Sequence, residues 1–331
     1  MAQLHYSINR RRLRVSEHVR ELSAGIQLNH RAFLQPVFAD ASLAERAALK
    51  HMPGIYSETE ESLLRGMVKD IQSGVRKFLL FPVPSEKQAV PSQFDFVTRV
   101  LQRVRAEFGQ DVWVAADACL CAYTPHGHCG LLDATGTRVD NHASVDCLAN
   151  YALRLAQAGA DCIAPSDMMD GRVSAIRNLL NAEGYDQVSI LSYSAKFSSH
   201  WYGPFRDACH SSPGKSALGN RKSYQLSPAN AEDAILCALR DAEEGADMLM
   251  VKPAGWYMDI LLRIREQVNL PIAAYHVSGE YAALEQAVGI GLLDRERAHL
   301  ELWTALKRAG ADIIISYAAR NAKNWIEQQN F

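Results

Sequence analysis

The chain has 331 residues, which is enough for one large domain or two of ordinary size. Its hydrophobic content of 48% and charged content of 22% are typical of a soluble globular protein. The net charge of −2 does not indicate nucleic-acid binding, and no apolar run approaches the ~20 residues of a membrane span. We therefore expect neither nucleic acid nor membrane among its partners.

Residues 1–29 differ in character from the rest of the chain. They carry Arg10, Arg11, Arg12 and Arg14, and no apolar core follows these charges, so a secretory signal is not indicated. The segment is either a disordered tail or an arm that packs on a neighbouring subunit. The odd number of cysteines, seven, favours a reducing cytoplasm in which thiols are free or bound to metal.

Eight short apolar runs then predict buried strands, with helical patterns between most of them. The expected strands are Phe33–Phe38, Phe78–Val83, Val112–Cys119, Cys162–Pro165, Val188–Tyr193, Met248–Pro253, Ile272–Val277 and Ile313–Tyr317. The clearest expected helices are Glu58–Ser73, Ser144–Ala158, Asn230–Glu244 and Asp259–Val268.

A repeated Gly-Ala-Asp motif supports a regular α/β architecture. It occurs at Gly159–Asp161, Gly245–Asp247 and Gly310–Asp312, each time after a helical pattern and before an apolar run. Eight strand–helix units in about 300 residues predict a closed (β/α)8 TIM barrel over residues 30–331. The alternative is a doubly wound open sheet, but no GxGxxG follows the first expected strand.

Three cysteines follow the third expected strand within the segment Asp117–Gly130. Thiolates of Cys119, Cys121 and Cys129 suit zinc, and three protein ligands leave a position for water or substrate, as in catalytic sites. Two alternatives remain open here. The cysteines can be ordinary core residues, or His126 and His128 can complete a closed structural site.

Two lysines end the fifth and sixth expected strands. At the C-terminal mouth of a barrel, Lys196 and Lys252 would each have a pKa lowered by burial and by the other ammonium. A neutral amine is the nucleophile that forms a Schiff base with a carbonyl substrate. The alternative is that each lysine reaches solvent or pairs with an acid.

A long segment, residues 197–224, has the composition of a lid over the mouth. Its cations Arg206, Arg221 and Lys222 can grip a carboxylate, or they can belong to a solvated basic loop. His276 is an acid–base candidate that we leave out, because a lone histidine is more often structural.

Several of these segments resemble the porphobilinogen synthase family, also called 5-aminolevulinate dehydratase. Asp117–Gly130 resembles its metal segment, and the resemblance runs from about Arg11 to the C-terminus. The other similar segments, in the same order, are Ile163–Ser166, Met169–Arg172, Ser192–Phe197, Tyr202–Arg206, Met250–Gly255, Ala274–Tyr281 and Ser316–Tyr317.

The resemblance implies a fold, a reaction and a set of site residues. Such enzymes are lyases of tetrapyrrole (haem) biosynthesis: they condense two molecules of 5-aminolevulinate to porphobilinogen with loss of two waters. They are TIM barrels with an N-terminal arm, here residues 1–29, and usually form cytoplasmic homo-octamers of dimers that embrace through the arms. By position, Lys252 and Lys196 would form Schiff bases with the substrates that become the propionate and acetate sides.

The remaining roles are also implied by position. Arg206 and Arg221, with Gln225 nearby, would hold the acetate-side carboxylate, and Ser278 and Tyr317 would hold the other one. Zn²⁺ would be bound by Cys119, Cys121 and Cys129, and Asp117 and Ser166 would be polar groups near the substrates.

Three positions depart from the family pattern. Cys237 stands where some bacterial relatives have a glutamate that binds an activating Mg²⁺, which argues against that ion here. Asn141-His142 replaces the usual Asn-Asp, and the segment 82–96 is shorter and less glycine-rich.

Two other functions fit parts of the sequence. A Schiff-base aldolase acting on a sugar phosphate would need a phosphate cradle after strands seven and eight, where Ser278–Glu280 instead carries an acid. A metal-storage or assembly protein would leave the two lysines unexplained.

Overall fold

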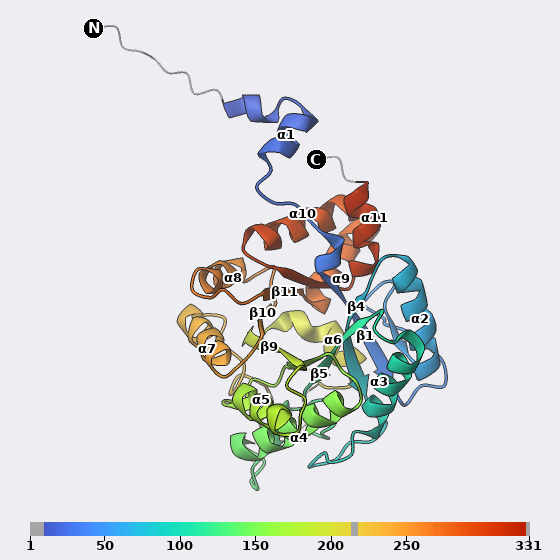
Figure 1. Ribbon diagram of the computed structural model, residues 1–331, viewed down its shortest axis with the longest axis vertical. Helices are drawn as coiled ribbons and strands as arrows, with labels where there is room; N and C mark the ends of the chain where they lie inside the picture. Colours follow the sequence, from blue (N-terminus) through green and yellow to red (C-terminus); the bar gives the residue numbers. More distant parts are fainter. Residues whose placement is uncertain (1–9, 213–217, 329–331) are drawn as a thin grey trace, which may run out of the picture.

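A computed structural model describes residues 10–212 and 218–328 (Figure 1). Eight parallel strands pair in sequence order, and the last strand pairs with the first, which closes the barrel. The strands are β1 (Phe33–Asp40), β4 (Lys77–Val83), β5 (Trp113–Ala118), β8 (Cys162–Pro165), β9 (Ser189–Lys196), β10 (Met248–Lys252), β11 (Ile272–His276) and β12 (Ile313–Ser316). The predicted barrel and all eight predicted strands are confirmed.

Helices surround the barrel, and their side chains complete the core against its outer face. They are α2 (Glu60–Gln72), α3 (Asp95–Phe108), α4 (Asn141–Gln157), α5 (Arg172–Ala182), α7 (Ala231–Glu243), α8 (Met258–Arg265), α9 (Ser278–Gly289), α10 (Arg295–Arg308) and α11 (Ala322–Glu327). Several start at a side-chain cap, as where Asn230 accepts from the backbone N–H of Asp233 at the start of α7.

The Gly-Ala-Asp repeat is a structural device at the N-terminal ends of the strands. Gly159 has φ +99°, and a Cβ there would lie 2.8 Å from the side chain of Arg105. Arg105 pairs with Asp161, whose carboxylate also accepts from the backbone N–H of Val114 in β5. The other two copies repeat this arrangement with Gly245, Arg177 and Asp247, and with Gly310, Arg265 and Asp312. The repeat therefore joins neighbouring barrel units on the face opposite the mouth.

Smaller elements lie outside this regular pattern. They are the short helices η1 (Arg10–Arg14), α1 (Glu17–Ser23), η2 (His30–Ala32), η3 (His200–Tyr202), α6 (Gly203–Ala208) and η4 (Ala319–Asn321), and the strand pairs β2 (Ala47–Ala48) with β3 (Tyr56–Glu58) and β6 (Leu131–Leu132) with β7 (Val139–Asp140). The segment with η1 and α1 extends away from the barrel (Figure 1). Residues 1–9 of the predicted arm and 213–217 of the predicted lid lie outside the described residues.

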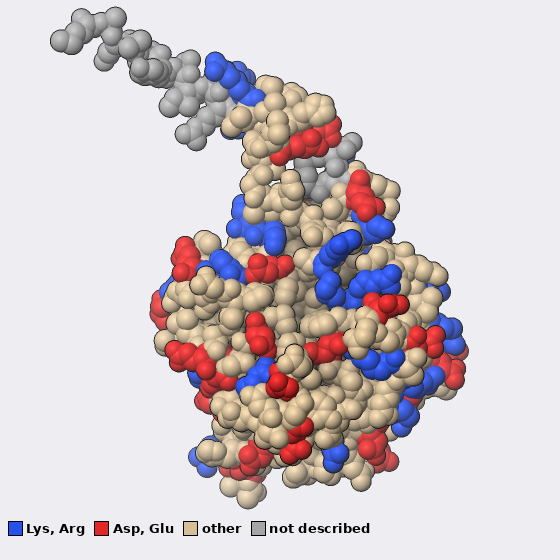
Figure 2. Space-filling view, viewed as in Figure 1, with Lys and Arg blue, Asp and Glu red and all other residues tan. Residues whose placement is uncertain are grey.

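Charges of both signs are interspersed over the face shown in Figure 2, in line with the net charge of −2. Within residues 10–212 and 218–328, no helix is both long and apolar enough to cross a membrane.

Candidate active site

Two lysines end adjacent strands at the mouth of the barrel. Lys196 is the last residue of β9, Lys252 is the last residue of β10, and the two are paired in the register of these strands. Only 5% of Lys196 and 4% of Lys252 are exposed to solvent. The ammonium group of Lys196 donates to the backbone carbonyl of Ser166.

A β-bulge in β9 directs Lys196 into the mouth. Between Ser192 and Ala195, β9 advances by three residues while its partner β10 advances by two. Strict alternation along a strand would place Tyr193 and Lys196 on opposite faces. Instead, Lys196 Nζ lies 5.5 Å from the centroid of the Tyr193 ring, so both side chains face the interior.

Aromatic side chains surround the amine of Lys252. Its Nζ lies 4.3–5.9 Å from the ring centroids of Tyr275, Phe205, Tyr193, Tyr202 and Phe81. Burial and then repulsion by Lys196 lower the pKa of Lys252, which is about 7 even though Asp117 opposes the change. A substantial fraction of this amine is therefore neutral near pH 7, as a nucleophile must be.

Asp117, in β5, is buried beside the lysines. Burial raises its pKa to about 6, although Lys196, Lys252 and a hydrogen bond from Ser166 favour the ionised form. Its Oδ1 makes no hydrogen bond of ordinary geometry within the described residues. A buried acceptor of this kind indicates a place where a ligand binds.

Three thiols form a separate cluster beside this pair. The sulfur atoms of Cys119, Cys121 and Cys129 lie within 4.8 Å of one another, and all three residues are buried. Hydrogen bonds from Cys119 and then Cys121 hold the pKa of Cys129 well below its usual value, while burial raises that of Cys119. A thiolate held among buried thiols is a donor set that suits zinc, so these residues fit the metal.

The two neighbouring histidines do not belong to this cluster within the part of the chain that the structure describes. His126 Nδ1 accepts from the backbone N–H of His128, and His128 Nδ1 lies 3.1 Å from the hydroxyl of Tyr224. The cluster of candidate ligands thus holds three sulfur atoms without a histidine, a set that fits the open catalytic type of site better than the closed one.

Two arginines of the lid lie beside the thiols with unused donors. Arg221 is buried, and its Nη2 donates to the carbonyls of Gly127 and Ser211 at 2.8 Å and 2.6 Å. Burial and then repulsion by Arg221 lower the pKa of Arg206. Among the described residues, Nε of both arginines and both amide atoms of Gln225 lack a hydrogen-bond partner. This arrangement can accept a carboxylate.

Ser278 and Tyr317 lie on the other side of the mouth. The Ser278 hydroxyl accepts from the backbone N–H of Phe205 at 3.1 Å, which connects the first residue of α9 to the lid helix α6. The Tyr317 hydroxyl lies 3.1 Å from that of Tyr275, the residue nearest to Lys252 Nζ among the surrounding rings. The structure thus brings the predicted residues to one mouth.

Comparison with known proteins identifies the family. The chain matches the family model of delta-aminolevulinic acid dehydratase over residues 7–325. The chain belongs to this family. The dehydratases of Bacillus subtilis and Escherichia coli are 40% and 41% identical to it, over 97% and 93% of this chain and 99% and 94% of their own lengths.

A solved structure gives the same result. The delta-aminolevulinic acid dehydratase (porphobilinogen synthase) of Toxoplasma gondii, in complex with its product porphobilinogen, superimposes with a TM-score of 0.93. It is 38% identical, and the match covers 97% of this chain and 92% of that one. The chain is therefore an enzyme, a lyase with the porphobilinogen synthase function of its family, rather than a sugar-phosphate aldolase or a metal-storage protein.

Several residues of the dehydratase site were not predicted from sequence. The aromatic residues around Lys252 come from three strands and the lid, so no local pattern connects them. A buried network was also missed: Arg172 contacts Asp241 at 3.0 Å and Asp167 at 3.6 Å, and it donates to Ser192 beside the bulge. The similarity of the Met169–Arg172 segment to the family was the one sequence feature that could have drawn attention to this buried network.

The departures from the dehydratase pattern can now be placed. Cys237 lies on α7 with its sulfur 3.9 Å from a carboxylate oxygen of Asp233. His142 is exposed, and nothing in the structure explains its substitution. The short segment 82–96 lies against the metal segment and the lid, because Gln88 donates to the carbonyl of Tyr123 and Lys87 to that of His210.

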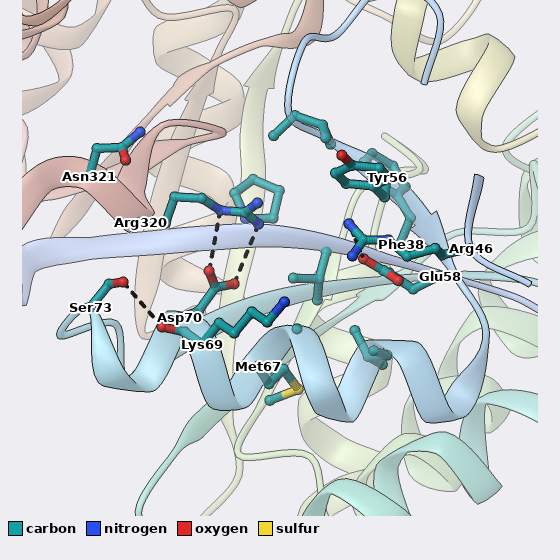
Figure 3. A pocket seen from close by; sticks show the side chains of 15 residues that line it. Phe38, Arg46, Tyr56, Glu58, Met67, Lys69, Asp70, Ser73, Arg320 and Asn321 are labelled. Carbon is teal, nitrogen blue, oxygen red and sulfur yellow. Dashed lines mark hydrogen bonds and ion pairs between the residues drawn. The ribbon is translucent and has the colours of Figure 1, made fainter. Parts of the chain in front are cut away.

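A polar cavity of about 380 Å³ lies away from the lysines, between β1, β3 and α2 (Figure 3). Four of its charged side chains form two ion pairs, Arg320 with Asp70 at 3.3 Å and Arg46 with Glu58 at 3.6 Å. None of the predicted site residues lines it.

Proposed function

We propose that the chain condenses two molecules of 5-aminolevulinate to porphobilinogen, with loss of two waters, through Schiff bases at both lysines. The observation that carries the proposal is the buried register pair of Lys196 and Lys252 beside a three-thiol cluster. Holding both substrates covalently makes their joining intramolecular, which removes much of its entropic cost.

Lys252 is proposed to bind the substrate that becomes the propionate side. Its neutral amine attacks the ketone carbon, a C–N bond forms, and the carbonyl oxygen leaves as water to give the imine. The surrounding aromatic rings exclude bulk water, which favours the neutral amine before the reaction. Ser278 and Tyr317 would hold this substrate's carboxylate through their hydroxyl groups.

Lys196 is proposed to bind the acetate-side substrate in the same way. Arg206 and Arg221 would hold its carboxylate, and Gln225 would contribute its amide. Their unpartnered buried Nε and amide atoms support this assignment, because a carboxylate would supply the missing acceptors. It would also reduce the repulsion between the two guanidinium groups.

Cys119, Cys121 and Cys129 are proposed to hold Zn²⁺, which when bound polarises the acetate-side carbonyl or supplies a base at neutral pH. Asp117 and Ser166 would be polar groups near the substrates: the carbonyl of Ser166 accepts from Lys196, and Asp117 Oδ1 has no hydrogen-bond partner within the described residues. We propose no Mg²⁺ at the Cys237 position, because a thiol is a poor ligand for that ion.

We further propose a cytoplasmic homo-octamer in which residues 1–29 act as arms. Leu13, Val15 and Leu22 of the arm are 57–88% exposed, as expected of side chains that a neighbouring subunit would cover. All seven cysteines are unpaired, which is compatible with a reducing compartment.

Borohydride trapping tests the covalent mechanism. The protein would be incubated with 5-aminolevulinate, reduced, digested and mapped by mass spectrometry. We expect the added mass on Lys252, with or without a second adduct on Lys196. Folded, zinc-loaded protein that gives no adduct on either lysine would contradict the Schiff-base mechanism.

A further inference from the structure

The C-terminal turn of the lid, residues 221–225, contacts the metal segment directly. A single nitrogen of Arg221 donates both to Gly127 of the metal segment and to Ser211 of the lid. Three residues later, the Tyr224 hydroxyl accepts from the backbone N–H of Cys129 at 3.3 Å. One turn of chain therefore contacts the ligand segment at two points.

Tyr224 is placed to orient a metal ligand without being one. Its ring packs against the three buried cysteines. While its oxygen accepts from Cys129, its proton can be donated to His128 Nδ1, which lies at 3.1 Å. The backbone of Cys129 is thus fixed from the lid, and with it the direction in which the sulfur points.

Close packing at Gly127 supports the same coupling. Gly127 has φ +69°, and a Cβ added there would lie only 2.7 Å from the carbonyl oxygen of Ser212. The lid is seated so closely on the metal segment that one cannot shift without moving the other.

The lid turn is also tied to the end of the lysine strand. Leu226 donates to the carbonyl of Lys196 at 3.1 Å and accepts from Ser198 at 2.8 Å. Movement of the lid would therefore displace the metal segment and the end of the strand at Lys196 together.

We propose that Tyr224 is a positioning residue that couples the lid to the metal centre, so that lid closure and zinc binding by Cys119, Cys121 and Cys129 favour each other. The coupling rests on the metal centre proposed above. Because linkage between two equilibria is reciprocal, zinc should close the lid as much as closure tightens zinc binding.

The test compares the full-length wild-type protein with Tyr224→Phe, which keeps the ring and removes the hydroxyl. Zinc affinity is measured by competition with a chromophoric chelator, and lid closure by the rate at which trypsin cuts after Lys222. Loss of an outer contact to a ligand residue typically weakens metal binding by about 10-fold or more. We expect a loss of that size, together with a smaller difference in trypsin cleavage between zinc-saturated and chelated protein.

Tyr123→Phe is the matched control. It removes a buried hydroxyl of the same segment whose partner, at 3.0 Å, is the hydroxyl of Tyr151 rather than a cysteine backbone. Its zinc affinity should equal that of the wild type, and circular dichroism would verify that both variants are folded.

The outcomes separate the two proposals. Wild-type affinity and unchanged zinc-dependent protection in Tyr224→Phe would overturn the coupling and leave the metal centre intact. A wild-type protein that binds no zinc at its cysteines would overturn the metal centre itself, and the coupling with it.

Discussion

Lys196 lies opposite Lys252 in the register of β9 and β10, so two potential cations share one buried, largely aromatic environment. Both cannot easily be charged together, since each ammonium raises the free energy of the other. Burial first, and then repulsion by Lys196, thus lower the pKa of Lys252 to about 7, so that a substantial fraction of this amine is neutral near pH 7.

Replacement of either charged neighbour should shift the pKa of Lys252 in opposite directions. Lys196→Met removes a repulsion and should raise that pKa, whereas Asp117→Asn removes an attraction and should lower it, each by roughly one unit. The readout is the pH midpoint of borohydride trapping at Lys252. Shifts of the same sign in both variants would refute this account of the pair.

Chelation should stop turnover without preventing the first Schiff base. The proposed zinc acts on the acetate-side substrate, whereas the amine of Lys252 is surrounded by aromatic rings rather than by the thiols. Protein stripped of zinc should therefore still give the Lys252 adduct and regain activity when zinc is added back. Loss of trapping together with loss of activity would show that the metal also supports the propionate side.

Gly279→Ala should displace the lid. A Cβ at Gly279 would lie 2.5 Å from the carbonyl oxygen of Trp201, which is backbone and cannot move aside alone. We expect kcat/KM to fall by about 10-fold or more, as small misplacements at active sites do. Gly289→Ala, at the other end of α9, meets no atom within 4 Å and is the control that should keep wild-type kinetics. Equal kinetics in both variants would contradict the prediction that close contact between Gly279 and the lid is needed for activity.

Arg172→Met should strongly destabilise the fold. Arg172 is fully buried between Asp167 and Asp241, so its removal leaves buried carboxylates without a partner, at a cost of about 3 to 5 kcal/mol in the free energy of unfolding. Arg138→Met breaks an exposed pair with Asp133 and should change the free energy of unfolding far less. Denaturant titrations of both variants measure the difference.

His276 should make the fold acid-sensitive. Burial and then His299 lower its pKa to about 3, so below about 6.5 the unfolded state binds the proton more readily than the folded state. Stability should fall by about 1.4 kcal/mol per pH unit from about 6.5 toward 3 because of this group. Melting curves of wild type and His276→Gln over that range test it, since the variant should have the shallower dependence.

The sequence was most informative where the chemistry is local. The eight strands were predictable because each is a short apolar run, and the thiol cluster because its ligands lie within eleven residues. Contacts between residues far apart in the chain could not be predicted from the sequence. The rings around Lys252 meet only in the closed barrel, and the partner of Arg172, Asp241, lies 69 residues away.

The bulge in β9 was unpredictable for a different reason. From Leu191 to Lys196 apolar and polar residues alternate strictly, so the pattern predicts a regular strand and hides the extra residue. The lysine was assigned to the mouth because it ends a strand, and its correct orientation depends on an irregularity that only the register shows.

That extra residue has a practical consequence for protein engineering. If the same residues were forced into regular pairing without the bulge, Tyr193 and Lys196 would lie on opposite faces, and one of the two side chains would point into the surrounding helices. A designer who transplants this lysine pair into another barrel must therefore transplant the strand irregularity as well, since residue identities alone do not specify the site.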